Sequence, residues 1–249
     1  MIILLSPAKL MRPYNATAAA QLVFKKETNL VIKQLKKWSL KEVQLCMKLS
    51  ADKALEAYNY IHNWGKKGNE SQSAPALYAY IGEAFKALDA ENLQENELVY
   101  LQENLFILSG LYGVLSAQTR VEPYRLEMAQ AAVLPENQSL YSFWKKPIRD
   151  FLNKTLSKED CIINLASAEY SKVVEDPKLL ARMITPQFLE LNNGKPKAVS
   201  VFSKQARGTM LRWCAQLQLK EPEQLKSFDL LGYHFDAARS TSNDWIFIR

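Results

Sequence analysis

Three basic residues in one predicted helix, Lys204, Arg207 and Arg212, lie close to a glycine and have the chemistry of an anion receptor. They belong to residues 195–220, a stretch with six basic residues and no Asp or Glu. The charge of that stretch, +6, equals the formal net charge of the whole chain. Arginine and lysine donors beside a glycine suit phosphate, the commonest biological anion of that shape. We therefore predict that this helix contributes to a phosphate-binding site.

The spacing of apolar residues predicts a helix over residues 203–218 that docks with one face. Lys204, Arg207, Gly208 and Arg212 fall on the opposite face, so the helix would present its charge away from the core. One alternative is a solvated face that only keeps the protein soluble. However, Lys204 and Arg207 are neighbours on one turn and repel each other, so an acidic group or a ligand must offset them. The apolar stripe consists of Ala206, Met210, Trp213, Cys214 and Leu217.

Polar side chains also follow the two segments that the sequence predicts as buried strands, residues 1–5 and 161–166. Lys9 comes shortly after the first segment, and Asn164 and Glu169 lie at the end of the second. Polar groups at strand ends often line a cleft. Asn164 is equally suited to hydrogen-bonding a loop, so a binding role and a structural role both remain open for it.

If residues 123–128 are extended, their successive side chains point to opposite sides. Arg125 and Glu127, two positions apart, then point the same way. One interpretation is a plain ion pair, and the other is an anion-binding arginine that the carboxylate orients. In the second interpretation Lys9, Arg125, Lys204 and Arg207 grip a phosphorylated or nucleotide-like small molecule. Glu127 or Glu169 would then be the general base of an enzyme.

Two short helices near residues 39–62 suggest a different partner, DNA. Lys48 and Lys53 flank the joint between them, and Ser50 lies at the joint itself. A helix-hairpin-helix unit uses such a joint to direct backbone N–H groups at a DNA phosphate. Glycines normally form that hairpin and none is present here, so plain packing of the two helices is the alternative. Any DNA contact would be through the phosphate backbone, independent of sequence and strongly dependent on salt.

Residue spacing does not support a metal site, a cofactor or a nucleophilic centre. The two histidines, His62 and His234, have no ligand partners at metal-binding spacing. The sequence contains no Walker loop, dinucleotide fingerprint or G-x-S-x-G motif. The three cysteines, Cys46, Cys161 and Cys214, are expected to be buried free thiols. We expect no metal and no cofactor, and no catalytic motif assigns an enzymatic reaction.

Strands scattered among helices predict a mixed α/β (α+β) fold in a single domain of residues 1–249. Its central sheet would be surrounded by helices and by the helix-hairpin-helix-like element near residues 39–62. Helices are predicted over residues 24–62 with two breaks, and over residues 76–88, 92–108 and 141–156. A hairpin is predicted from strands at residues 188–191 and 198–202, which flank the turn residues 192–195, and a closing antiparallel pair is predicted at residues 232–237 and 245–249.

Composition favours a globular cytoplasmic protein. Hydrophobic residues make up 48% of the chain, which is ample for a packed core. No apolar run is long enough to span a bilayer, and the apolar start is too short for a signal peptide. We therefore expect no membrane association. A sequence pI near 9.0 is compatible with nucleic acid without requiring it.

Several segments taken together resemble the YaaA family, the bacterial peroxide-stress proteins. The resemblance implies a cytoplasmic, single-domain protein with a mixed fold and a positively charged cleft. It also implies DNA binding through a helix-hairpin-helix and protection from iron-dependent damage under hydrogen peroxide, with no established enzymatic activity. By position, the family's recurrent polar residues correspond to Lys9, Arg125, Glu127, Asn164, Lys204 and Arg207. The segments are residues 5–9, 108–115, 123–128, 163–170, 204–208 and 232–235.

The resemblance is weaker in the helical pair. Ser50, Ala54 and Trp64 match the family pattern, but Asp52 stands where a lysine is typical. An acid at that position opposes phosphate contact, although Lys53 could substitute. We predict a DNA-binding protein of the response to hydrogen peroxide as the first function. An enzyme acting on a phosphorylated or nucleotide-like small molecule in the same cleft is the alternative.

Overall fold

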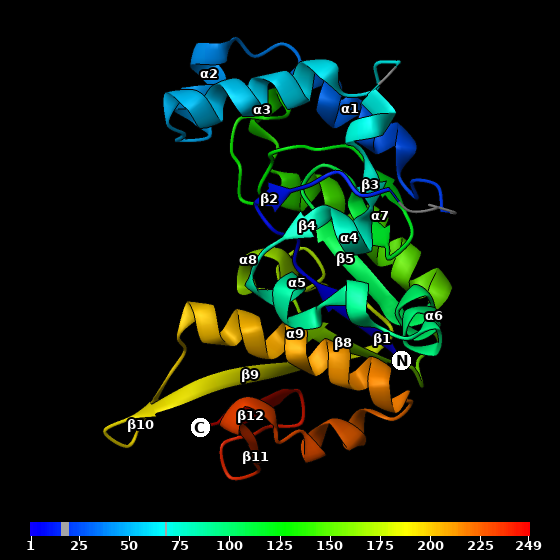
Figure 1. The fold of residues 1–249 in the computed structure, drawn as a ribbon, viewed down its shortest axis with the longest axis vertical. Helices are drawn as coiled ribbons and strands as arrows, with labels where there is room; N and C mark the ends of the chain where they lie inside the picture. Colours follow the sequence, from blue (N-terminus) through cyan, green and yellow to red (C-terminus); the bar gives the residue numbers. More distant parts are fainter. Residues whose placement is uncertain (16–19, 68) are drawn as a thin grey trace.

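A mixed sheet lies at the centre of the computed structural model, which describes residues 1–15, 20–67 and 69–249 (Figure 1). Within these residues the sheet has eight strands, in the order β11-β12-β9-β8-β1-β5-β6, and β10 pairs with β9 outside this path. The fold is therefore mixed α/β, as predicted. The strands are β1 (Ile2–Leu5), β5 (Leu105–Ser109), β6 (Gly113–Ser116), β8 (Cys161–Leu165), β9 (Arg182–Asn192), β10 (Lys195–Lys197), β11 (His234–Asp236) and β12 (Asp244–Ile248).

Five neighbouring strands, β12, β9, β8, β1 and β5, run parallel, and antiparallel β11 and β6 close the two sides. The chain passes from β1 to β5 on one side and later returns to β8 on the other side of β1. The direction of winding thus reverses between β1 and β8. In open α/β sheets, this reversal leaves a crevice outside the carboxyl ends of the two strands.

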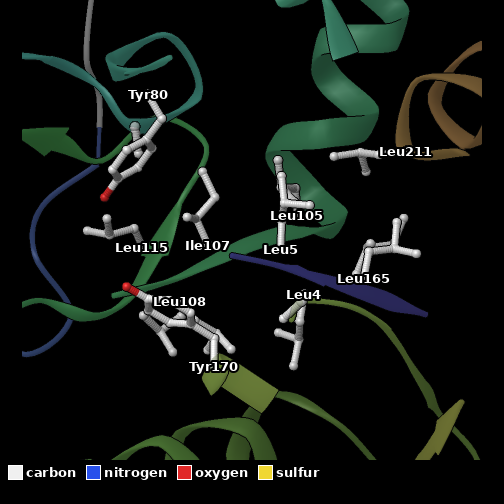
Figure 2. Close-up of a cluster of buried hydrophobic side chains, with 14 of the residues drawn as sticks. Leu4, Leu5, Tyr80, Leu105, Ile107, Leu108, Leu115, Leu165, Tyr170 and Leu211 are labelled. Carbon is white, nitrogen blue, oxygen red and sulfur yellow. The ribbon is translucent and has the colours of Figure 1, made fainter. Parts of the chain in front are cut away.

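Helices cover both faces of the sheet. Helices α5 (Glu83–Leu88), α6 (Glu95–Asn104) and α9 (Ser200–Leu217) pack together on one face. Helix α7 (Leu140–Thr155) lies on the other, where Phe151 packs edge-on against Phe106 of β5. Figure 2 shows Leu4 and Leu5 on opposite sides of β1, with Leu211 of α9 on the side of Leu5. Alternate side chains of β1 therefore fill two apolar layers.

The segment from residue 25 to residue 63 forms a helical cap at one end of the molecule, at the top of Figure 1. Its helices are α1 (Lys25–Leu35), α2 (Leu40–Cys46) and α3 (Ala51–Asn63), so the two predicted breaks are confirmed. Ser39 and Glu42 form a capping box at the start of α2, the S-x-x-E pattern that marks a helix start in a sequence. The turn between α2 and α3 places Lys48 at a φ of 51°, so a lysine occupies the left-handed conformation that glycine usually takes.

Two helix predictions are wrong in part. Residues 76–88 form α4 (Ala76–Ala79), a two-residue strand β4 (Tyr80–Ile81) and then α5. The predicted helix over residues 92–108 ends at residue 104, where strand β5 begins. Both errors arise from short apolar runs, which fit a buried strand and a buried helix equally well. The remaining short elements are β2 (Leu10–Met11), β3 (Ala74–Pro75), β7 (Arg120–Val121), α8 (Ala168–Ser171) and five 3₁₀ turns of the described chain.

The prediction that α9 docks with one face only is also wrong. One face packs on the sheet, but Gly208 on the opposite face is buried against α5. A Cβ at position 208 would overlap the carbonyl oxygen of Ala84 and stand 2.7 Å from its carbonyl carbon. The glycine is required because the two helices approach this closely. Leu217, placed on the apolar stripe, is instead 55% exposed, because it lies at the last position of α9.

The predicted closing strands are confirmed, and the predicted hairpin is right in its turn and first strand but wrong in its second strand. That strand is β10 at Lys195–Lys197, whereas residues 198–202, predicted as the strand, lead into α9, which begins at Ser200. Asn193 and Gly194 both have positive φ and join β9 to β10, which protrude together from the body of the molecule (Figure 1). Strands β11 and β12 pair in antiparallel fashion at the end of the chain. Helix α7 starts at the predicted cap, where the Ser139 hydroxyl accepts a hydrogen bond from the Ser142 N–H.

Candidate functional site

A cavity of about 400 Å³ opens at the carboxyl ends of β1 and β8, where the winding of the sheet reverses. Its walls come from the residues that follow these strands, from segment 124–127, and from α5 and α9. Charged side chains line it with a surplus of cations over carboxylates. They are Lys9, Lys86, Arg125, Lys204 and Arg207 against Glu83, Glu127 and Glu169.

Two serines connect the ends of β1 and β8 at the base of the cavity. The Ser6 hydroxyl accepts a hydrogen bond from the Ser167 N–H at 2.8 Å and donates one to the Ser167 hydroxyl at 3.2 Å. Ser167 occupies the N-cap position of α8, as expected, but its hydroxyl makes no capping hydrogen bond. The pair holds the two strand ends together, which fixes the positions of the loops that carry Lys9 and Glu169.

Glu127 joins two of the predicted cations. Its Oε1 lies 2.7 Å from Lys9 Nζ and 3.2 Å from Arg125 Nη2. Arg125 and Glu127 therefore lie on the same side of their segment, as the alternation predicted. Gly110 lets this segment approach closely, since a Cβ there would stand 2.9 Å from the carbonyl oxygen of Leu126. The structure thus contains the ion pair, and the anion-binding role of Arg125 stays a prediction.

Glu83 pairs with one side chain of its own helix, α5, and with one of the neighbouring helix α9. It lies 3.3 Å from Lys86 Nζ in α5 and accepts a hydrogen bond from Gln205 Nε2 of α9 at 2.8 Å. These interactions lower the pKa of Glu83, the hydrogen bond from Gln205 being the largest cause. The charge of Lys86 is therefore largely balanced within α5.

Lys204 and Arg207 remain without an ion-pair partner among the described residues. Arg207 is the more unusual, because its Nε is buried and finds no hydrogen-bond partner in this part of the chain. Burial lowers the pKa of its guanidinium below the ordinary value. A buried cation without a partner destabilises a protein. An anionic ligand would therefore gain more binding free energy beside Arg207 than beside the cations that are already paired.

Two of the predicted site residues make contacts within the protein, and a third lies apart from the cavity. Asn164 is buried, and its side chain donates to Thr185 Oγ1 at 3.1 Å and accepts from the Ala166 N–H at 3.1 Å. Arg212 Nη1 donates to the carbonyl oxygens of Leu88 and Asp89 at 2.9 Å, at the end of α5. Neither residue lines the cavity. Ser50 begins α3 without a side-chain capping bond and does not line the cavity.

Lys53 lies nearer to the site than Lys48 does. A smaller hollow of about 50 Å³ beside the main cavity is lined by Lys53 and Tyr60 of α3 together with Lys9 and Arg125. Lys48 is exposed at the turn between α2 and α3 and lines neither hollow. The helical cap therefore adjoins the mouth of the cavity through α3.

Sequence reasoning missed the contribution of α5 and of the serines. Glu83 and Lys86 line the cavity, but the predicted continuous helix over residues 76–88 gave no reason to place them there. The glycine that precedes α5 was an available signal, because it interrupts the helical pattern at residue 82. Ser6 and Ser167 were visible as residues at the ends of the predicted strands.

The described residues contain no group of three or more His, Cys, Asp or Glu side chains arranged to hold a metal ion. A search of the same residues finds no helix with the length and apolar character needed to cross a membrane.

The crevice at the switch in winding, with its surplus of cations, is typical of α/β proteins that bind anionic ligands. Within this class the chain belongs to the YaaA family, since residues 1–239 match the family model described as "Peroxide stress protein YaaA". That description connects the family with the response to peroxide stress. The resemblance that the sequence motifs indicated is thereby confirmed.

Relatives resemble this chain over its whole length. It is 37% identical over 254 residues to a UPF0246 protein of Janthinobacterium sp. (strain Marseille), covering 100% of this chain and 98% of the relative. It is 38% identical to a UPF0246 protein of Colwellia psychrerythraea, covering 100% and 99%. It is 35% identical to UPF0246 protein NMA1114 of Neisseria meningitidis, covering 100% and 98%.

Two of the three cysteines, Cys161 and Cys214, are poorly suited to sensing peroxide. Burial raises the pKa of the Cys161 and Cys214 thiols, and peroxide oxidises thiolates rather than thiols. Cys46 is half-buried. We expect a disulfide-exchange reagent such as DTNB to label Cys46 alone in the folded protein and all three thiols after unfolding. Rapid labelling of Cys161 or Cys214 before unfolding would contradict this prediction.

Proposed function

We propose that the protein binds a phosphorylated, nucleotide-like small molecule in the cavity formed by α5, α9 and the ends of β1 and β8. The observation that supports this most directly is the buried Nε of Arg207, which has no hydrogen-bond partner within the described chain and belongs to a half-buried side chain that lines the cavity. A phosphate group would supply both the negative charge and the acceptor oxygens that Arg207 lacks. Lys204, one turn earlier on α9, adds a second cation that forms no ion pair with the described residues.

The size of the cavity favours a small molecule over a duplex. A volume of about 400 Å³ lies at the lower end of the range for sites that enclose small ligands. A nucleotide fits such a volume, whereas a DNA duplex can only meet its mouth. The cavity also combines charged residues with apolar walls, which a phosphate joined to an organic ring would match.

If the protein is an enzyme, Glu169 is the better candidate for its general base. Glu127 already accepts from Lys9 and Arg125, so its Oε1 is engaged within the protein. Glu169 lines the same cavity, and no cation of the described residues pairs with it. The proposal of catalysis rests on this difference between the two carboxylates.

Ligand binding is tested by calorimetric titration with inorganic phosphate, ribose 5-phosphate and nucleoside monophosphates. We expect at least one of these to bind, and Lys204→Ala to weaken that binding by about tenfold or more. Lys220→Ala is the matched control, because Lys220 is an exposed lysine just beyond α9 and does not line the cavity. Equal binding by both variants, or no binding by the unaltered protein, would reject the proposal.

Glu127 competes with a bound anion for Lys9 and Arg125. We therefore expect Glu127→Gln to bind phosphate about threefold to tenfold more tightly than the unaltered protein, because removing the carboxylate frees two cations. Titration at low ionic strength measures the change, and added salt should diminish it, since Lys9 is 65% exposed. Weaker phosphate binding by Glu127→Gln would show that Glu127 instead positions Arg125.

We propose as a second function that the helical cap contacts DNA phosphates. Residues 25–67 contain ten lysines and four carboxylates, and all ten lysines are exposed. Such an excess of positive charge on one end of a protein attracts nucleic acid without reading its sequence. The family's connection with peroxide stress is consistent with this function, because oxidative damage affects DNA.

A gel-shift titration of duplex DNA against salt tests this second function. We expect binding that weakens steeply with salt and that is reduced in a Lys48→Ala, Lys53→Ala double variant. Asp52→Lys should strengthen it, because it replaces an exposed acid by a base beside Lys53. Absence of any shift at low salt would reject DNA binding without affecting the proposal for the cavity.

A further inference from the structure

The charged groups of the cavity fall into paired and unpaired sets. Lys9 and Arg125 pair with Glu127, and Lys86 pairs with Glu83. Apart from these pairs, three charged groups among the described residues that line the cavity have no opposite charge within ion-pair distance. Two are the cations Lys204 and Arg207 of α9, and the third is the carboxylate of Glu169 in α8.

Glu169 offers a carboxylate oxygen to the cavity. Its Oε1 accepts a hydrogen bond from the Ala129 N–H at 3.2 Å, which ties the side chain to the loop after segment 124–127. No described residue donates to Oε2. A carboxylate accepts hydrogen bonds and never donates them when ionised, so it selects a ligand group that carries N–H or O–H.

Ser167 adds a second polar group at the same end. Its hydroxyl oxygen accepts from Ser6, and its own proton has no acceptor among the described side chains. A ligand atom next to Glu169 would therefore meet one acceptor from Glu169 and one donor from Ser167. An amino group beside a ring nitrogen presents the complementary pair of a donor and an acceptor.

Two tyrosines supply apolar surface on the walls. The hydroxyl of Tyr124 is engaged with Ser109 at 2.7 Å and with Tyr80 at 2.9 Å, and burial raises the pKa of Tyr124 to about 12. Tyr170 has a backbone hydrogen bond with Met128 and is likewise buried. Because the Tyr124 hydroxyl is engaged within the protein and Tyr170 is buried, the two rings contribute apolar surface, which suits a planar base.

We propose that the ligand is a nucleotide whose base carries an exocyclic amino group. The phosphate lies on Lys204 and Arg207, and the amino edge of the base donates to Glu169. This inference rests on the proposed function of the cavity and narrows its ligand class. It assigns Glu169 a specificity-determining role: an oxo group in place of the amino group would set two acceptors against each other.

Two pairs of nucleotides isolate this contact, because each differs only by an amino or an oxo group. We expect calorimetric titration to show that cytidine monophosphate binds about tenfold more tightly than uridine monophosphate, or adenosine monophosphate than inosine monophosphate. In Glu169→Gln, whose amide can donate as well as accept, the ratio should fall to about threefold or less. Glu103→Gln, at an exposed carboxylate of α6 outside the cavity, should retain the full ratio.

The outcomes separate this inference from the function on which it rests. If phosphate-bearing ligands bind in a way that depends on Lys204, but neither pair shows a preference for the amino member, the inference is overturned and the proposed function stands. A preference that persists in Glu169→Gln also overturns it. If no nucleotide, ribose 5-phosphate or phosphate binds, both the inference and the proposed function fail.

Discussion

Gly208→Ala is expected to lower the melting temperature by about 6–12 °C, the largest effect on stability that we predict. The added Cβ would overlap the carbonyl oxygen of Ala84, and three atoms of that residue's backbone lie within 3.0 Å of it. Backbone cannot rotate away as a side chain can, so α5 and α9 must separate. We estimate a cost of at least about 3 kcal/mol, and each 1 kcal/mol shifts the melting temperature of a protein of this size by about 2–4 °C.

Gly194→Ala is the matched control for this prediction. Gly194 has a φ of 74° in the β9–β10 hairpin, but no atom lies within 4 Å of the position of its Cβ. The Gly194→Ala variant therefore incurs only the conformational cost of an alanine in the left-handed region, about 1–2 kcal/mol. Thermal denaturation followed by circular dichroism compares the two variants. A Gly208→Ala protein no less stable than Gly194→Ala would show that the helices can move apart at little cost.

The convergence of Lys9, Arg125 and Arg207 was predictable because each follows from a local rule. Lys9 comes after a buried strand, and Arg125 lies on the same side of an extended segment as Glu127. Arg207 belongs to a helix with no acidic residue of its own to balance it. A crevice at strand ends brings such side chains together regardless of their separation in sequence.

The distinct roles of Arg207 and Arg212 could not be predicted from their positions on α9. Both were expected on the exposed face, but Arg212 donates to the carbonyl oxygens at the end of α5, whereas Arg207 reaches the cavity. The difference depends on α5, a helix more than a hundred residues earlier. Gly208 was the available clue, because a glycine inside a helix is unfavourable unless another backbone approaches it closely.

The way the fold is built explains why α5 belongs to the site. Gly208 lets helix α9 approach α5 closely, and Gln205 on the same helix lies beside Glu83. Glu83 is thereby engaged by Gln205 and by Lys86, and cannot also neutralise Arg207. Close packing of the two helices therefore both shapes the wall of the cavity and leaves its central cation without a partner.

Arg207→Met is expected to raise stability and to abolish anion binding. Methionine has a similar length and fills the same space, but it removes a buried cation whose Nε has no partner in the described chain. We expect a gain of about 1–2 kcal/mol in the free energy of unfolding, since exchanging buried charge for an apolar side chain is often stabilising. In the same variant the affinity for phosphate-bearing ligands should fall about a hundredfold or more, because the charge-assisted hydrogen bonds are lost.

Arg212→Met, a change on the same helix, is expected to shift stability in the opposite direction. Its loss leaves carbonyl oxygens at the end of α5 without their donor, so we expect a destabilisation of about 2 kcal/mol with ligand affinity unchanged. Thermal denaturation without ligand and calorimetric titration with a nucleotide measure both effects. If Arg207→Met is destabilised as much as Arg212→Met and still binds ligand, Arg207 has a structural role. If Arg207→Met is instead more stable than the unaltered protein and Arg212→Met is less stable, then Arg207 lowers the stability of the protein but is needed for binding, as expected of a functional residue.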